Sequence, residues 1–78
     1  MVSAEILREL YRVDNRYWKT GDVDILPKRR ELAGLIDKTY YSEVAGIARI
    51  ITQRRYPVAK LAEVLTLLGY EVEQEAWR

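Results

Sequence analysis

The chain has 78 residues, 49% apolar and 32% charged with a net charge of +1, which is the composition of an ordinary globular protein and the length of one small domain, residues 1–78. It contains neither cysteine nor histidine, which excludes disulfides, thiolate nucleophiles, imidazole acid–base catalysis and the usual zinc ligand sets. No apolar run approaches the roughly 18 residues that span a bilayer, so we expect a cytoplasmic protein that contacts no membrane. Because the side chains most used in catalysis and metal binding are missing, we also expect that it is not an enzyme and holds no metal or cofactor.

The charged residues are unevenly distributed along the chain. Residues 28–60 hold eight basic and three acidic side chains, whereas residues 1–27 hold four and five, and residues 61–78 hold one and four. The middle of the chain therefore carries a local charge of +5 between two acidic segments. This polarity predicts one cationic face.

The first predicted helix covers about residues 3–19, with Ser3 as its cap and the turn formers TGDVD after it. Its apolar residues recur at the helical spacing of three and four: Ile6, Leu7, Leu10, Tyr11, Val13, Tyr17 and Trp18. Its other face carries arginines with acids within one turn of them, namely Arg8, Arg12, Arg16, Glu5 and Glu9. This spacing favours a solvated ion-pair stripe over a set of phosphate contacts.

The second predicted helix begins at Pro27 and ends near residue 37, because proline is tolerated in a first helical turn. Its predicted buried stripe consists of Leu32, Ala33, Leu35 and Ile36. Lys28, Arg29 and Arg30 lie at its N-terminal end, where the helix dipole disfavours cations. Two interpretations stay open for this triplet: contact with an anionic partner, or a plain solvated surface.

The third predicted helix covers about residues 41–54, in the stretch YSEVAGIARIITQ, with Ser42 as its candidate cap. Rotations of 100° per residue divide it into two faces. The apolar face consists of Val44, Ile47, Ala48 and Ile51, and the polar face of Ser42, Gly46, Arg49 and Gln53. The polar face thus combines a hydroxyl, a guanidinium, an amide and a glycine that allows another backbone to come close. These groups are typical of surfaces that read base edges and phosphates. An ordinary amphipathic surface helix is the other interpretation.

A basic corner, TQRRYPVAK, joins this helix to the fourth. Continued rotation brings Arg54 and Arg55 to the azimuth of the apolar face, so we expect them beyond the helix end. Pro57 begins a helix of about residues 57–68, and Gly69 ends it. More than half of its circumference is apolar: Val58, Leu61, Ala62, Val64, Leu65, Leu67 and Leu68.

Such an apolar helix is either central to the bundle or contacts a second copy. The tail YEVEQEAWR alternates in character and predicts a short extended segment that pairs across a dimer, or disorder of its last residues. We therefore expect a homodimer. Its predicted interface consists of Val64, Leu67, Leu68, Tyr70 and Val72.

Over residues 31–72, the stretches ELAGLI, ARIITQRRYP and VAKLAEVLTLLGYEV resemble the helix-turn-helix domains of the Cro and phage-repressor class. The antitoxin-like members are the most similar, because their final helix typically ends in a Leu-Gly pair before an extended tail. The resemblance implies that Leu32 and Ala33 pack under the turn and that the helix of residues 42–53 reads the major groove of duplex DNA.

The sequence thus predicts an all-α fold of four helices with a helix-turn-helix core and a short extended C-terminal tail. The leading functional hypothesis is a small DNA-binding protein: a repressor, an antitoxin or an excision-type accessory factor. Its predicted groove contacts are Ser42, Glu43, Arg49 and Gln53, and its predicted phosphate contacts are Lys28, Arg29, Arg30, Lys38, Arg54 and Arg55.

The alternative is a phage- or plasmid-encoded protein-interaction module or inhibitor. The chain has six tyrosines and two tryptophans but no phenylalanine, and Tyr and Trp dominate interface hot spots. The predicted anchors are Tyr11, Tyr17, Trp18, Tyr40 and Tyr41. Salt separates the two hypotheses, because DNA binding weakens steeply with salt and an apolar interface responds much less.

Overall fold

The computed structural model describes residues 1–39, 41–74 and 77, and these form an all-α fold. Four α-helices follow one another: α1 (Ala4–Thr20), α2 (Leu26–Ile36), α3 (Tyr41–Gln53) and α4 (Val58–Leu67). A single 3-10 turn, η1 (Val23–Ile25), precedes α2. The all-α prediction is confirmed, and every predicted helix end lies within one residue of the observed one. In this part of the chain none of the helices combines the length and the apolarity that a bilayer crossing requires.

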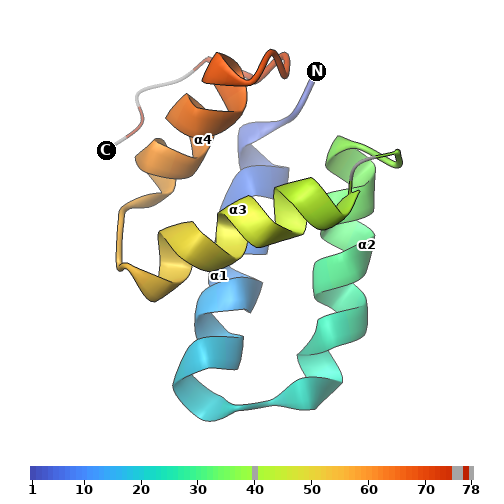
Figure 1. The fold of residues 1–78 in the computed structure, drawn as a ribbon, viewed down its shortest axis with the longest axis vertical. Helices are drawn as coiled ribbons and strands as arrows, with labels where there is room; N and C mark the ends of the chain where they lie inside the picture. Colours follow the sequence, from blue (N-terminus) through green and yellow to red (C-terminus); the bar gives the residue numbers. More distant parts are fainter. Residues whose placement is uncertain (40, 75–76, 78) are drawn as a thin grey trace.

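Helix α1 is the centre of the fold. Figure 1 shows α1 and α2 running in roughly opposite directions, α3 lying across them and α4 packing beside α1 and α3. Helix α1 contacts each of the other three helices. The core therefore lies between α1 and the layer formed by α3 and α4, and α2 closes one end of it. Its fully buried side chains include Leu7, Leu10, Leu61 and Leu65.

The caps of α1 are as predicted. The hydroxyl of Ser3 accepts a hydrogen bond from the backbone N–H of Ile6 at 3.1 Å, and Gly21 adopts the left-handed conformation at the other end. Within the predicted apolar stripe Leu7, Leu10 and Val13 are buried in the core and Tyr11 packs against it, whereas Ile6 and Tyr17 are half-buried and Trp18 is 38% exposed. The unpredicted feature is Asp14, which is fully buried in the middle of the stripe.

Helix α2 buries fewer of its apolar side chains than predicted. Leu32 and Ala33 are buried and Ile36 packs against the core, but Leu35 is 57% exposed. Helical rotation puts Arg29, Leu32, Ala33 and Ile36 on one arc, and Leu35 falls outside it. Among the elements that the structure describes, α2 contacts α1, α3 and η1, and none of these covers the outer side on which Leu35 lies.

The C-terminal tail pairs with the start of its own chain. Val2 and Val72 form a parallel bridge: the N–H of Val2 donates to the carbonyl of Glu71 at 2.6 Å, and the N–H of Glu73 donates to the carbonyl of Val2 at 2.7 Å. Both valines are buried. The predicted extended conformation is confirmed at this bridge, where the tail pairs with the N-terminus of its own chain; its pairing across a dimer stays a prediction. The prediction for the last residues concerns 75, 76 and 78, which lie outside the described residues.

The other predicted interface residues divide into two groups. Tyr70 packs against the core, and its hydroxyl donates to the carboxylate of Asp37 at 3.1 Å; Val64 also packs partly against the core. Leu67 and Leu68, by contrast, are 78% and 51% exposed at the end of α4. The predicted set therefore does not form one surface.

Candidate functional site

The exposed side of α3 carries the polar stripe that the sequence predicts. Ser42, Arg49 and Gln53 are exposed and Gly46 is half-buried, while Val44, Ala48 and Ile51 are buried on the opposite side. A Cβ atom added at Gly46 would meet no other atom within 4 Å. The stripe is therefore an open surface that another molecule can approach closely.

A buried polar network lies beneath the stripe and joins three helices. The carboxylate of Asp14 on α1 accepts hydrogen bonds from Nε of Arg29 on α2 and, at 2.6 Å, from the hydroxyl of Thr52 on α3. Arg29 also donates through Nη2 to the carbonyl of Ala45 at 2.6 Å. The two partners of the buried carboxylate on α1 thus come from α2 and α3. This network fixes α3 relative to α1 and α2.

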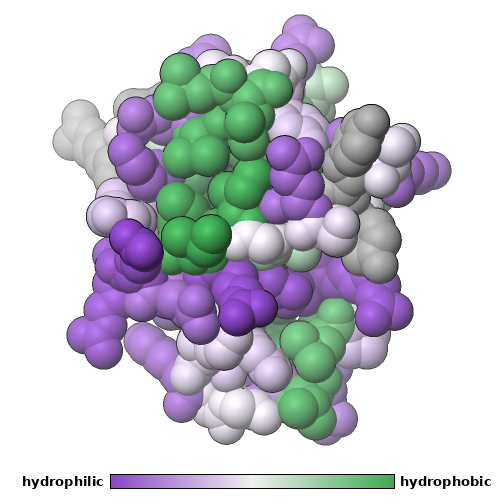
Figure 2. All heavy atoms as spheres, in the orientation of Figure 1, coloured by the Kyte–Doolittle hydropathy of each residue, from purple (hydrophilic) through white to green (hydrophobic). Residues whose placement is uncertain are grey.

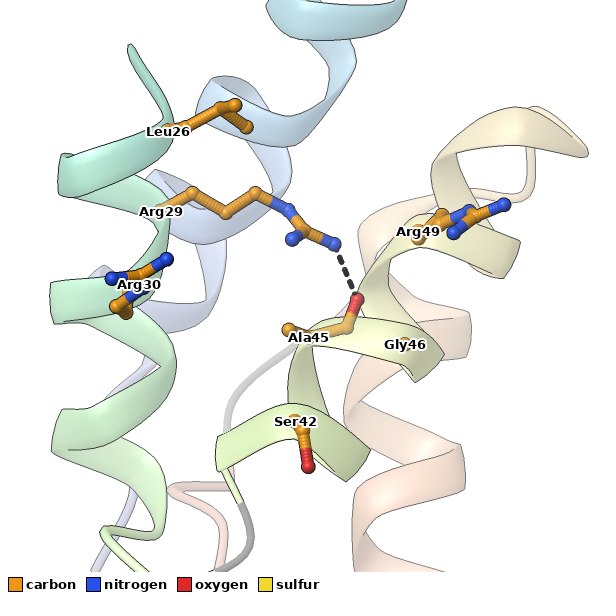
Figure 3. A pocket seen from close by; sticks show the side chains of 7 residues that line it. All are labelled: Leu26, Arg29, Arg30, Ser42, Ala45, Gly46 and Arg49. Atoms are coloured by element: carbon orange, nitrogen blue, oxygen red, sulfur yellow. Dashed lines mark hydrogen bonds between the residues drawn. The ribbon is translucent and has the colours of Figure 1, made fainter. Parts of the chain in front are cut away.

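Arg29 therefore has a different role from the predicted phosphate contact. Its side chain is only 19% exposed, and its charge is compensated by Asp14. Figure 3 shows the guanidinium reaching from α2 to the carbonyl of Ala45 on α3. The prediction is corrected: Arg29 holds the helices together, and its charge is not free for a ligand.

A groove of about 360 Å³ lies between exposed parts of α2 and α3. It is lined by Leu26, Arg29, Arg30, Ser42, Ala45, Gly46 and Arg49. Figure 3 shows Arg30 and Arg49 projecting from the two facing helices. None of these lining residues is acidic, and Asp14 already compensates Arg29, so Arg30 and Arg49 give the groove its positive charge.

A second hollow, of about 570 Å³, lies on the other side of α3, against α1. It is lined by Tyr11, Asn15, Trp18, Lys19, Thr52, Gln53 and Arg55, again without an acidic side chain. The guanidinium of Arg49 lies over the ring of Trp18, 5.5 Å from its centroid, and so stands between the two hollows. We call the stripe and the two hollows together the α3 face.

The corner after α3 places Arg55 at this face in a strained conformation. The N–H of Arg55 donates to the carbonyl of Thr52 and that of Tyr56 to Ile51, the pattern of a Schellman cap. The capping position is usually glycine, yet Arg55 occupies it with φ +59°. Helix α4 ends in the same pattern with Gly69 at φ +98°. Arg55 therefore occupies a position at which glycine would adopt the left-handed conformation at a lower free-energy cost.

Two predicted contacts lie away from the α3 face. Glu43 lines a different hollow, with Asp37 and Leu68, on the side of α4. Arg54 continues the α3 spiral, since its N–H donates to the carbonyl of Ile50 at 3.0 Å, and it follows the azimuth of Ile47 and Ile50. The grouping of Glu43 and Arg54 with Arg49 is therefore corrected, because helical rotation turns both toward α4.

Two other predicted cations are exposed beside α2. Lys28 forms an ion pair with Glu31 at 3.8 Å, and Lys38 lies in the connection between α2 and α3. Neither lines the groove or the hollow of the α3 face. Sequence reasoning missed Lys19, Asn15 and Thr52, and their spacing on α1 and α3 gives no signal before the helices are packed.

Of the arginines on the outer side of α1, Arg12 forms a predicted ion pair, and Arg8 and Arg16 have partners outside the predicted stripe. Arg12 binds Glu9 closely, and this hydrogen bond holds the pKa of Glu9 below its ordinary value and the pKa of Arg12 above its own. Arg16 lies 3.7 Å from Asp22, and the guanidinium of Arg8 lies 5.2 Å from the ring centroid of Trp77. These cations have partners within the chain and are not part of the α3 face.

The predicted aromatic anchors are only partly available to a partner. The hydroxyl of Tyr11 donates to the carbonyl of Tyr56 at 2.6 Å, and Tyr17 packs edge-on against Trp18 at 4.9 Å between centroids. Trp18 is thus the aromatic residue that α1 presents most openly. Tyr40 and the side chain of Tyr41 lie outside the described part of the chain.

Comparisons with family models, curated proteins and solved structures returned no match to this chain.

Proposed function

We propose that this protein binds double-stranded DNA through the α3 face and acts as a small homodimeric regulator: a repressor, an antitoxin or an excision-type factor. The short connection between α2 and α3, and the course of α3 across the other helices, support this proposal, because helix-turn-helix proteins present their reading helix in this way (Figure 1). Ser42, Arg49 and Gln53 are of the types that bond to base edges.

The position of Arg49 is the observation that carries the proposal. Its guanidinium is exposed between two hollows whose linings lack carboxylates, and it lies over the ring of Trp18. An arginine that no core contact requires, standing on an open helix beside Gly46, is suited to a bidentate contact with guanine.

Three cations surround this reading position and would bind phosphates. Arg30 comes from α2, Lys19 from the end of α1, and Arg55 from the corner after α3. Because they lie on both sides of the stripe, they would hold the two phosphate backbones that border one groove. Phosphate contacts of this kind give affinity for any sequence, whereas Arg49 would give preference for one.

The strained conformation of Arg55 supports the same assignment. A left-handed non-glycine residue costs about 1–2 kcal/mol, and glycine is the usual residue in this cap. Residues with strained backbone conformations are concentrated at functional sites. A guanidinium that contacts phosphate gives a reason for arginine at this corner.

The test compares Arg49→Ala with Arg12→Ala, which removes the same charge from the outer side of α1. A preferred duplex is first selected from a random pool with the wild-type protein. We expect Arg49→Ala to lose about 1–3 kcal/mol of binding free energy on that duplex and little on random DNA. Arg12→Ala should bind both as the wild type does.

An Arg49→Ala protein that binds every duplex like the wild type would contradict the proposal. The protein-interaction alternative, with Trp18 as its exposed aromatic anchor, would then be the better account. Equal loss on both DNAs would make Arg49 a phosphate contact and move base reading elsewhere.

A further inference from the structure

An apolar patch is exposed along the seam between α3 and α4. Ile50 on α3 is 52% exposed, Leu67 at the end of α4 and Leu68 directly after it are 78% and 51% exposed, and Ile47 and Val64 are half-buried against the core. Figure 2 shows apolar atoms gathered over α4, next to the hydrophilic atoms across the middle of the same view. Contiguous apolar surface on so small a domain marks an interaction site.

The α3 side of this patch is a ridge with opposite charges at its ends. Glu43, Ile47, Ile50 and Arg54 follow one another at spacings of four, three and four residues, which keeps them on one side of the helix. The hydrogen bond from the N–H of Arg54 to Ile50 extends this geometry to the last member. Glu43 and Arg54 are exposed, and neither forms an ion pair with any residue that the structure describes.

The α4 side adds an acidic neighbour at one end of the patch. Leu68, directly after α4, lines a hollow with Glu43 and Asp37 from the other side of the seam. Lys60 lies in the first turn of α4, next to the corner that holds Arg54, but its charge is compensated by Glu63 at 3.6 Å. One end of the patch is therefore acidic through Glu43, the other end is basic through Arg54, and the middle is apolar.

We propose that this patch binds a second copy of the chain in an antiparallel, two-fold arrangement, with Glu43 of each copy against Arg54 of the other. At 1.5 Å per residue, Glu43 and Arg54 lie about 16 Å apart along the ridge. When a second copy lies antiparallel to the first, the same spacing places each Glu43 opposite the Arg54 of the other copy. A parallel pairing would set like charges against each other. The inference rests on the homodimer of the proposed function and adds its surface and its polarity.

The α3 face stays accessible in this dimer. The stripe of Ser42, Arg49 and Gln53 lies about 100° around α3 from the ridge of Glu43 and Arg54. Variants in the ridge therefore change association without removing a residue of the stripe, so association and DNA binding can be measured separately.

A charge-exchange experiment tests the pairing. Sedimentation equilibrium without DNA is measured for the wild type, Glu43→Arg, Arg54→Glu and the double variant. We expect a wild-type dimer, a dimer dissociation constant raised at least about tenfold in each single variant by like-charge contacts, and recovery to within about threefold of wild type in the double variant. Glu5→Arg, an exposed reversal on α1, is the matched control and should leave association unchanged.

A wild-type monomer at tens of micromolar, unchanged association in the single variants, or a double variant as weak as the singles would each overturn the inference. Circular dichroism confirms that each variant is folded, and because both side chains are exposed, none should lose the fold. The two proposals can fail separately. Loss of the dimer with retained DNA binding refutes this interface alone, and a charge-exchange dimer that binds no DNA refutes the DNA proposal alone.

Discussion

Asp14 is the residue on which the geometry of the α3 face depends. A fully buried carboxylate is tolerated because Arg29 and Thr52 bond to its two oxygens. Removing one partner of a buried ion pair leaves the other uncompensated in the interior. The network therefore joins stability to function: it holds α3 at a fixed angle, and Asp14 compensates the charge of Arg29, which lines the groove.

We predict that Asp14→Ala lowers the free energy of unfolding by about 3–5 kcal/mol, because Arg29 would lose its counter-ion. Thr52→Val should cost less, since the carboxylate keeps its guanidinium partner. Urea denaturation followed by circular dichroism measures both. Arg12→Ala, which breaks an exposed ion pair, should leave the midpoint nearly unchanged. A loss below about 1 kcal/mol for Asp14→Ala would mean that the network is dispensable.

The sequence contained only half of the information about this network. Leu7, Leu10 and Asp14 follow the helical spacing, so the sequence places an acid on the apolar side of α1, but the burial of this acid was not predicted. Which arginine pairs with Asp14 depends on how α2 packs against α1. The sequence alone does not distinguish Arg29 from the adjacent Arg30. For this reason Arg29 was predicted with Arg30 as a phosphate contact, although the structure separates their roles.

At the level of the elements, the positions of the helix ends followed from local chemistry. Rotation along α3 predicted that Arg54 and Arg55 lie beyond its last regular turn, and Pro57 and Gly69 marked the limits of α4. The left-handed conformation of Arg55 was not predicted, because an arginine gives no signal for it. The polar stripe of α3 was predicted in full, since it depends only on the helical period.

We predict that Arg55→Gly raises the free energy of unfolding by about 0.5–1 kcal/mol and lowers affinity for DNA of every sequence. Glycine relieves the left-handed conformation and removes one cation from the α3 face. Thermal denaturation and fluorescence anisotropy with random duplex DNA measure the two effects. Arg55→Lys, which keeps both the charge and the strain, is the control and should change each of them less. If Arg55→Gly binds DNA with unchanged affinity, Arg55 does not contact DNA.

At the scale of the whole molecule, the two chain ends are tied together. The bridge between Val2 and Val72 brings the tail against the start of α1, and the N–H of Ala4 donates to the carboxylate of Glu73 at 3.2 Å. Alternation in the tail predicted an extended segment, but a two-residue period does not specify which edge the segment joins. The pairing of Val72 with Val2 was therefore not predicted from the sequence.

We predict that Val72→Ala lowers the free energy of unfolding by about 1–3 kcal/mol, because a buried side chain at the junction of both chain ends is truncated. Glu71→Ala is the matched control. The side chain of Glu71 is exposed and its backbone carbonyl, which accepts the bond from Val2, is retained. Urea denaturation should thus distinguish the two neighbours. Equal effects would show that the tail contributes little to the core.

The central claim, that the α3 face binds DNA, is tested most directly by the affinity of the wild-type protein for random duplex DNA at a series of salt concentrations. If Lys19, Arg30 and Arg55 each neutralise one phosphate, the logarithm of the binding constant should fall with the logarithm of salt at a slope of about −2.7 per protomer. The triple variant of these residues to alanine should bind with a slope near zero. Absence of binding at low salt, or an affinity that salt does not change, would contradict the account.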